Sequence, residues 1–125
     1  MAVLDASAVI ALLVREPGAE VVQKAMSRAE ISSVNLAEVI TKLIDRGFTE
    51  SDISLVMERL RLHVHPFDEA AAYRSARLRA ATRARGLSLG DRACLALGVA
   101  LSQPVLTADQ SWAKLDVGVD VRVIR

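Results

Sequence analysis

The sequence predicts an α/β protein with a mostly parallel sheet and helices on both faces. Two observations lead to this fold class. Short strand-like segments alternate with helix-like segments along the whole chain, which is the pattern of a parallel sheet with crossover helices. The strand segments are apolar at nearly every position, as strands covered on both faces are. The 125 residues suffice for one core, so we expect a single domain over residues 1–125.

Apolar periodicity and turn residues define the elements of the first half. Pro17-Gly18 separates the first two helices, Gly47 ends the third, Thr49 with Asp52 opens the fourth, and Pro66 ends the strand that follows. The third helix carries one apolar stripe at i, i+3, i+4, i+7 and i+8. The expected elements are a strand over 3–4, helices over 8–14 and 21–26, a strand over 30–32, helices over 36–44 and 53–60, and a strand over 62–65.

The second half begins with a long expected helix. Asp68 caps it, it runs to about Arg85, and Gly86 stops it. Ser88 opens another helix, which is apolar on nearly every side over 93–101 and is therefore expected to be buried. The remaining elements are a strand over 105–106, a short helix over 109–115 with Trp112 in the core, and a last strand over 119–123.

Cysteine and histidine usage excludes several kinds of site. The single cysteine, Cys94, cannot form an internal disulfide and lies in an apolar run, so we expect a buried thiol and a reducing cytoplasm. His63 and His65 are the only histidines, which argues against zinc sites rich in His or Cys. They alternate along a strand-like segment, where structural roles are the more common.

The chain has no segment typical of a membrane protein. Its longest apolar run is about half of the ~20 residues that a membrane helix needs, and Asp5 interrupts any signal-peptide pattern at the N-terminus. We therefore expect a cytoplasmic protein with no membrane association.

Four acidic residues occupy positions where open α/β sheets bind ligands, beyond the carboxyl ends of strands. Asp5 ends the first strand, Glu38 lies early in the helix after the second, Asp91 lies in the first turn of the apolar helix, and Asp109 follows the strand over 105–106. Taken together, they are expected at one edge of the sheet.

Each acid also has a structural explanation. Asp5 and Asp109 are suitable helix N-caps, a role worth ~1 kcal/mol. Asp91 stands three residues after Ser88, as in a capping box. Glu38 precedes Lys42 by four residues, which is the favourable order for a surface ion pair.

The joint placement favours a metal site. Close carboxylates repel and raise one another's pKa, so protons or a divalent cation must neutralise them. Mg²⁺ or Mn²⁺ suits ligands that are all oxygen and would support hydrolysis of a phosphodiester. Ser7 and Thr107 stand beside two of the acids, where their hydroxyl groups would orient the ligands. Plain helix or strand-end capping explains these two residues about equally well.

Four motifs resemble those of the PIN-domain nucleases, and the resemblance spans the whole chain. The length and the last two motifs look most like the VapC toxin ribonucleases of type II toxin-antitoxin modules. The motifs are Asp5-Ala6-Ser7, Ser33 to Glu38, Leu87-Ser88-Leu89-Gly90-Asp91-Arg92-Ala93 and Leu106-Thr107-Ala108-Asp109.

The resemblance implies a sheet of order 3-2-1-4-5, a Mg²⁺ or Mn²⁺ cofactor and cleavage of RNA. It also implies a homodimer and inhibition by a co-produced antitoxin protein. By motif, Asp5, Glu38 and Asp91 match the three core acids of the family, and Asp109 matches the more variable fourth. No residue departs from the pattern at these positions.

Arginines gather just before Asp91 in a stretch without acids, between Ala70 and Gly90. Such a basic surface attracts a polyanion that carboxylates alone would repel, although an ordinary solvated helix face explains it nearly as well. Aromatic residues are only 3% of the chain, so backbone contacts should outweigh base stacking. The candidate RNA-binding residues are Arg74, Arg77, Arg79, Arg83, Arg85 and Arg92.

Two other classes of protein are compatible with the outline of the sequence. A phosphoacceptor signalling domain has a similar length, but it needs paired acids after the first strand, and here Ala6 follows Asp5. In that class Asp68 would be tested as the acceptor. A catalytically silent interaction module would keep the PIN-like fold, although the intact acids argue against it.

Overall fold

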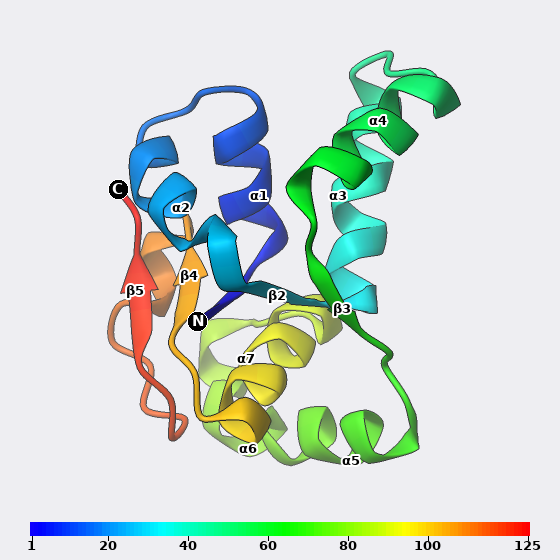
Figure 1. Cartoon of the computed structure of the whole chain (residues 1–125). Coiled ribbons are helices and arrows are strands. Elements are labelled where there is room, and N and C mark those ends of the chain that lie inside the picture. Colours follow the sequence, from blue (N-terminus) through cyan, green and yellow to red (C-terminus); the bar gives the residue numbers. More distant parts are fainter.

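Five strands, all parallel, form the central sheet in the order β3-β2-β1-β4-β5 (Figure 1). The computed structural model describes residues 1–125. Both the fold class and the strand order that the resemblance implied are confirmed, and the sheet is parallel throughout. The strands are β1 (Ala2–Leu4), β2 (Ala29–Ser32), β3 (His63–His65), β4 (Val105–Thr107) and β5 (Val121–Val123).

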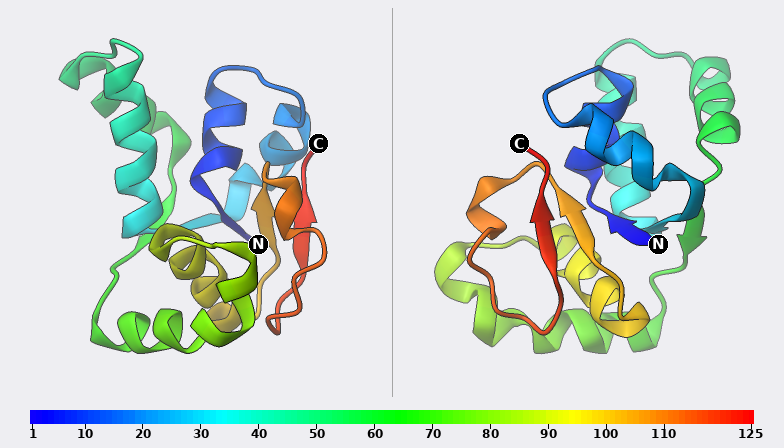
Figure 2. Two further views of the ribbon diagram at one scale, coloured as in Figure 1. Left: turned by 180° about the vertical axis from the view of Figure 1, so that it is seen from behind. Right: turned by 60° about the vertical axis from the view of Figure 1, so that its left-hand side comes forward.

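Helices cover both faces of the sheet (Figures 1 and 2). One side carries α1 and α2, the other carries α5, α6 and α7, and the α3–α4 pair projects beyond the sheet on the β3 side. The helices are α1 (Ala6–Leu13), α2 (Ala19–Ala25), α3 (Ser33–Asp45), α4 (Glu50–Leu60), α5 (Glu69–Arg77), α6 (Arg79–Thr82) and α7 (Leu89–Leu101). Short 3₁₀ turns follow at Met26–Arg28, Arg83–Arg85 and Gln110–Trp112.

Alternation along β1 divides the core into two clusters. Successive side chains of a strand point to opposite faces, so Leu4 packs among residues of α1, α2 and α3, whereas Val3 packs with Cys94 and Leu95 of α7. Trp112 completes the second cluster and is fully buried. The expected burial of Cys94 and Trp112 is confirmed. No helix has the length and apolar character needed to cross a bilayer.

The long helix expected from Asp68 to Arg85 is wrong in its extent. The chain leaves regular helix geometry after Arg77 and continues as α6 and a 3₁₀ turn. Thr82 is fully buried, and its hydroxyl donates to the carbonyl of Leu78 at 2.8 Å. Hydroxyl bonds of this kind often bend helices, and this one accompanies a break that apolar periodicity does not reveal.

One other expectation needs a smaller correction. The helix expected over 109–115 is only a 3₁₀ turn. The helix expected to be buried over 93–101 is buried at Ala93, Cys94, Leu95, Ala96 and Gly98, and it is exposed only at Val99 and Ala100 near its end. Both capping boxes are present, at Thr49 with Asp52 and at Ser88 with Asp91.

Candidate active site

Asp5 lies at the carboxyl end of β1, where the strand passes directly into α1. The residue is 6% exposed. Its side chain accepts no hydrogen bond from a backbone N–H of the first turn of α1, so helix capping does not explain it. Instead its Oδ2 accepts hydrogen bonds from the hydroxyl groups of Ser7, at 2.6 Å, and Thr107, at 3.0 Å. These two hydrogen bonds are the contacts that the hydroxyl groups need in order to orient Asp5, as expected from the sequence.

The electrostatics of Asp5 show which acids lie near it. Burial raises the pKa of the Asp5 carboxyl, the hydroxyl groups of Ser7 and Thr107 lower it, and the negative charges of Asp91 and Glu38 raise it further. The net direction is upward. The metal-free site therefore holds more negative charge than its surroundings stabilise.

Glu38 is fixed by a contact between α3 and α7. The Nδ2 group of Asn35, one turn earlier, donates to Glu38 Oε1 at 2.8 Å and to the carbonyl oxygen of Gly90 at 3.0 Å. A Cβ atom at Gly90 would lie 2.6 Å from Glu38 Oε2, so the carboxylate rests against bare backbone. The surface ion pair expected with Lys42 is not formed; Glu38 is held inward against α7 instead.

Asp91 belongs to the N-terminal turn of α7 and to the site at once. Its Oδ2 accepts the backbone N–H of Ser88 at 2.9 Å, while Ser88 Oγ accepts the N–H of Asp91 at 3.2 Å. This reciprocal cap fixes the carboxylate where its charge acts on Asp5. Capping and participation in the site are therefore compatible for this residue.

Cys94 lies one helical turn after Asp91 and is fully buried. Burial raises the pKa of its thiol well above the ordinary value, and the charges of Asp5, Asp91 and Glu38 act in the same direction. Cys94 is thus a protonated, unreactive thiol. Two different groups, Asp5 and Cys94, respond to overlapping sets of carboxylates, which shows that these acids converge on one place.

Asp109 is the acid that the structure does not bring into this group. It is exposed, and its Oδ1 caps the following 3₁₀ turn by accepting the backbone N–H of Ser111 at 2.9 Å and its hydroxyl at 2.7 Å. It does not contribute to the pKa shift of Asp5. One indirect link exists, because the N–H of Asp109 donates to the same Thr107 hydroxyl that donates to Asp5.

The three converging acids fit a hard divalent cation. All their donor atoms are oxygen, the kind that Mg²⁺ and Mn²⁺ prefer. Every hydrogen bond to Asp5 goes to Oδ2, which leaves Oδ1 available. The oxygens of the three carboxylates are not all within 4.8 Å of one another.

The comparison with family models decides the classification. The model of the PIN domain matches residues 2–118, nearly the whole chain. The chain belongs to the PIN-domain family. The relationship that the four sequence motifs suggested is confirmed. A search of curated protein sequences gave no significant match.

Solved structures share the fold of this PIN domain over nearly its full length. A chain of the DNA-bound VapBC2 structure from Rickettsia felis superposes with a TM-score of 0.76 at 16% identity, with 97% of this chain and 96% of that chain covered. FitAcB from Neisseria gonorrhoeae gives 0.71 at 21% identity, with coverages of 99% and 98%. VapBC-5 from Mycobacterium tuberculosis, a toxin-antitoxin system, gives 0.62 at 27% identity, with coverages of 99% and 98%.

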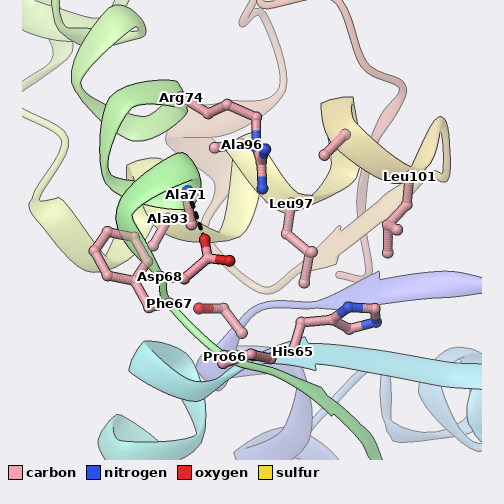
Figure 3. A pocket seen from close by; sticks show the side chains of 12 residues that line it. His65, Pro66, Phe67, Asp68, Ala71, Arg74, Ala93, Ala96, Leu97 and Leu101 are labelled. Atoms are coloured by element: carbon pink, nitrogen blue, oxygen red, sulfur yellow. Dashed lines mark hydrogen bonds between the residues drawn. The ribbon is translucent and has the colours of Figure 1, made fainter.

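The six candidate arginines of the PIN domain divide into two groups. Arg92 is half-buried, and its Nη1 donates to the carbonyl of Ser75, which ties α7 to α5. Arg74 is also half-buried and lines a hollow of about 150 Å³ between α5, α7 and the end of β3, where it reaches toward α7 (Figure 3). The other four are exposed, namely Arg77, Arg79, Arg83 and Arg85.

Asn35 is a residue of the candidate site that sequence reasoning did not single out. It is fully buried and holds both Glu38 and the Gly90 carbonyl. Its sequence signal was weak, although it stands three residues before Glu38 and so shares a helix face with it. A polar residue on the buried side of an amphipathic helix was the available clue.

Replacing Asn35 with Asp is expected to destabilise the PIN domain by about 3 kcal/mol or more, because it leaves an uncompensated buried charge. The new carboxylate would face the Glu38 carboxylate and the Gly90 carbonyl in place of the donated N–H groups. Urea unfolding of Asn35→Asp and Asn35→Ala measures the effect, with the smaller loss expected for Ala. Equal stability of Asn35→Asp and the wild type would contradict the contact.

Proposed function

We propose that this PIN domain, a single domain over residues 1–125, is a metal-dependent endoribonuclease and the VapC-type toxin of a type II toxin-antitoxin module. It would hydrolyse RNA phosphodiester bonds in the cytoplasm. The observation that carries the proposal is the grouping of Asp5, Glu38 and Asp91 beyond the carboxyl end of β1. Glu38 rests against Gly90, the residue before Asp91, and burial together with the negative charges of Asp91 and Glu38 raises the pKa of Asp5. Carboxylates grouped in this way can work together when a cation balances their negative charge.

Each residue has a defined task in the proposed reaction. Asp5, Glu38 and Asp91 would hold the ion, while Ser7 and Thr107 fix the orientation of the Asp5 carboxylate. Mg²⁺ or Mn²⁺ held there supplies positive charge that polarises the phosphate and lowers the pKa of water.

Asp109 is proposed as a fourth, outlying acid. It is exposed and stands one residue beyond Ala108, whose backbone N–H donates to Ser7 Oγ at 2.9 Å. It would act on the ion through water, since its Oδ1 is engaged by Ser111.

RNA binding is assigned to the arginines around α6, with the exposed Arg77, Arg79, Arg83 and Arg85 as the principal contacts. Arginine binds phosphate with two parallel hydrogen bonds, so the strength of binding should fall with rising salt. Arg74 and Arg92 would act mainly by holding α5 against α7.

A protein partner is proposed from the exposed apolar surface of α3 and α4. Ile44 is 57% exposed and Leu55 is 50% exposed. A hollow of about 360 Å³ lies between the two helices and is lined in part by Ile40 and Ile53. Apolar surface of this kind marks protein contacts. An antitoxin and a second copy of the chain are the proposed occupants. Structural relatives that are named as a toxin-antitoxin complex and as a member of a family of toxin-antitoxin systems support the first.

Asp91→Asn tests the proposed chemistry. The amide oxygen can still accept the N–H of Ser88, so α7 keeps its cap while the site loses a charge. Cleavage of RNA in Mg²⁺ or Mn²⁺ is expected to fall at least about 100-fold, since metal-borne charge stabilisation is worth several kcal/mol.

Asp52→Asn is the matched control for this variant. Asp52 closes the same kind of capping box at the start of α4, but it is exposed and does not belong to the acidic group. Its substitution should leave the cleavage rate unchanged. Full activity of Asp91→Asn would refute the nuclease assignment.

The phosphoacceptor alternative has less support. Doubly wound receiver-type sheets have the order 2-1-3-4-5, whereas this sheet has β2 and β4 beside β1. Asp68, its candidate acceptor, caps α5 by accepting the N–H of Ala71 at 2.9 Å. Phosphate transfer from acetyl phosphate to Asp68 would revive this alternative.

A further inference from the structure

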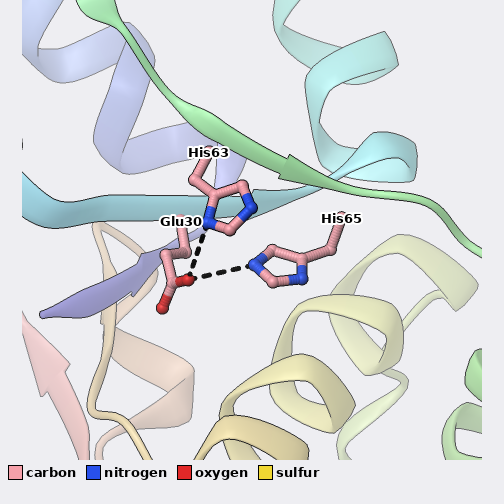
Figure 4. A group of neighbouring side chains, drawn as sticks. All are labelled: Glu30, His63 and His65. Carbon is pink, nitrogen blue, oxygen red and sulfur yellow. Dashed lines mark hydrogen bonds and ion pairs between the residues drawn. The ribbon is translucent and has the colours of Figure 1, made fainter.

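A second group of ligand-type side chains lies on the β2–β3 side of the sheet, within the strands. His63 and His65 are two residues apart on β3 and share one face, and Glu30 of β2 pairs directly with His63. Glu30 Oε1 lies 3.2 Å from His63 Nδ1 and 3.0 Å from His65 Nε2 (Figure 4). The three side chains thus point toward one another from adjacent strands.

The carboxylate of Glu30 has a hydrogen-bonding requirement that its neighbours do not meet. Its side chain is only 7% exposed, and its Oε2 is buried without a hydrogen-bond partner. A buried carboxylate oxygen with no hydrogen-bond partner is costly. Both histidines approach the same atom, Oε1, so the histidines themselves do not meet the requirement of Oε2.

We propose that Glu30, His63 and His65 bind a zinc-type transition-metal ion. One carboxylate and two imidazole groups form a donor set typical of Zn²⁺ sites that keep an open position. The three ligand atoms lie within 4.8 Å of one another. Two donors at ~2.0–2.1 Å from a tetrahedral ion are about 3.3 Å apart, close to the two distances from Glu30 Oε1.

The surroundings allow an ion to enter and the ligands to close around it. A hollow of about 330 Å³, open to solvent, is lined by Glu30, His63, Arg28 and Arg61 among others. His63 is 72% exposed, so its ring can turn toward the ion at little cost. The two arginines add positive charge, which would favour an anion or hydroxide at the open position of the metal.

This site is separate from the acidic site at the sheet edge. Glu30 pairs with Val3, two residues before Asp5 along the parallel strands. The charge of Glu30 is not among the causes of the raised pKa of Asp5. The donor sets also differ in kind, because imidazole nitrogen favours Zn²⁺ whereas carboxylate oxygens alone favour Mg²⁺ or Mn²⁺. The zinc site therefore does not depend on the proposed nuclease function.

Zinc titration of His63→Ala provides the test. In calorimetry, we expect the wild type to bind one Zn²⁺ at the site formed by Glu30, His63 and His65. When Co²⁺ replaces zinc, the protein should show the visible absorption of low-coordinate Co²⁺. His63→Ala should weaken zinc binding more than the ~10–100-fold that loss of an outer-shell partner costs. Because His63 is largely exposed, this variant should fold normally, and His65→Ala should show the same loss.

Asp5→Asn separates the two sites. Asp5→Asn should keep zinc binding and lose the thermal stabilisation by Mg²⁺. His63→Ala should lose zinc binding and keep the thermal stabilisation by Mg²⁺. Unchanged zinc affinity in His63→Ala, or no zinc uptake by the wild type, would overturn the zinc proposal and leave the nuclease proposal untouched. Zinc binding that persists while Mg²⁺ stabilisation is absent from the wild type would count against the nuclease proposal alone.

Discussion

Replacing Asp5 with Asn is expected to abolish Mg²⁺-dependent RNA cleavage and to make the metal-free protein more stable at neutral pH. The loss of activity should be at least about 100-fold, as for other losses of metal-borne charge stabilisation. The gain in stability follows from the raised pKa of the buried Asp5 carboxyl, because each pKa unit corresponds to about 1.4 kcal/mol against the charged form. An amide keeps the shape and removes the charge.

The raised pKa of Asp5 also determines how the stability of the metal-free protein depends on pH. A group with a raised pKa in the folded state contributes fully below its unfolded value, about 3.9 for Asp, and this contribution is lost as the pH rises through the folded value. Metal-free wild type should therefore lose stability relative to Asp5→Asn as the pH rises over that range. Urea unfolding at several pH values, with and without Mg²⁺, measures both effects.

Asp109→Asn is the control for Asp5→Asn. Asp109 is exposed and does not shift the pKa of Asp5, and an amide oxygen can keep its cap. Asp109→Asn should therefore show no comparable gain in stability at neutral pH. A destabilised Asp5→Asn at neutral pH would contradict the description of the site, and a wild type that Mg²⁺ does not stabilise would favour the silent interaction module.

Gly90→Ala should reduce cleavage by about 100-fold while costing little stability. Within a helix, Ala is normally better than Gly by up to about 1 kcal/mol, but here the new Cβ would lie 2.6 Å from Glu38 Oε2. The end of a flexible side chain can move away, so the fold survives and the carboxylate is displaced. A misplacement of about 1 Å in an active site costs on the order of 100-fold in rate.

Gly98→Ala gives the opposite pattern and serves as the comparison. It lies in the same helix, but its Cβ would lie 2.5 Å from Val105 Cγ2 in the core. We expect a clear loss of stability with the acidic site intact in the folded fraction. Paired melting curves and single-turnover cleavage rates distinguish the two variants. Equal specific activity of Gly90→Ala and the wild type would show that Glu38 is not needed at its observed place.

Local patterns predicted the layers of the fold well. Apolar strands and alternating helices were sufficient for a parallel sheet with two covered faces, while the strand order came from the motifs, because alternation alone does not order strands. The break after Arg77 lies beside the hydrogen bond from the buried hydroxyl of Thr82 to Leu78. A side-chain bond of that kind leaves no trace in hydrophobic periodicity.

Local patterns also predicted part of the candidate site. Strand ends locate residues such as Asp5, and the structure groups Glu38 and Asp91 with it. Contacts between distant elements were not predictable, as Asn35 shows by linking α3 to Gly90 of α7. The argument from the two histidines against zinc sites rich in His or Cys did not consider Glu30, which strand pairing places beside His63 and which would be the third ligand of the proposed zinc site.

The hydroxyl groups around Asp5 have a consequence for how the site responds to acid. Ser7 and Thr107 each accept a backbone N–H and give their single hydrogen to Oδ2. That oxygen already accepts two hydrogen bonds, so an incoming proton would bind Oδ1, the oxygen left free to hold the proposed ion. Proton and cation would then compete for the same oxygen atom, and acidification would release the metal without any movement of the backbone.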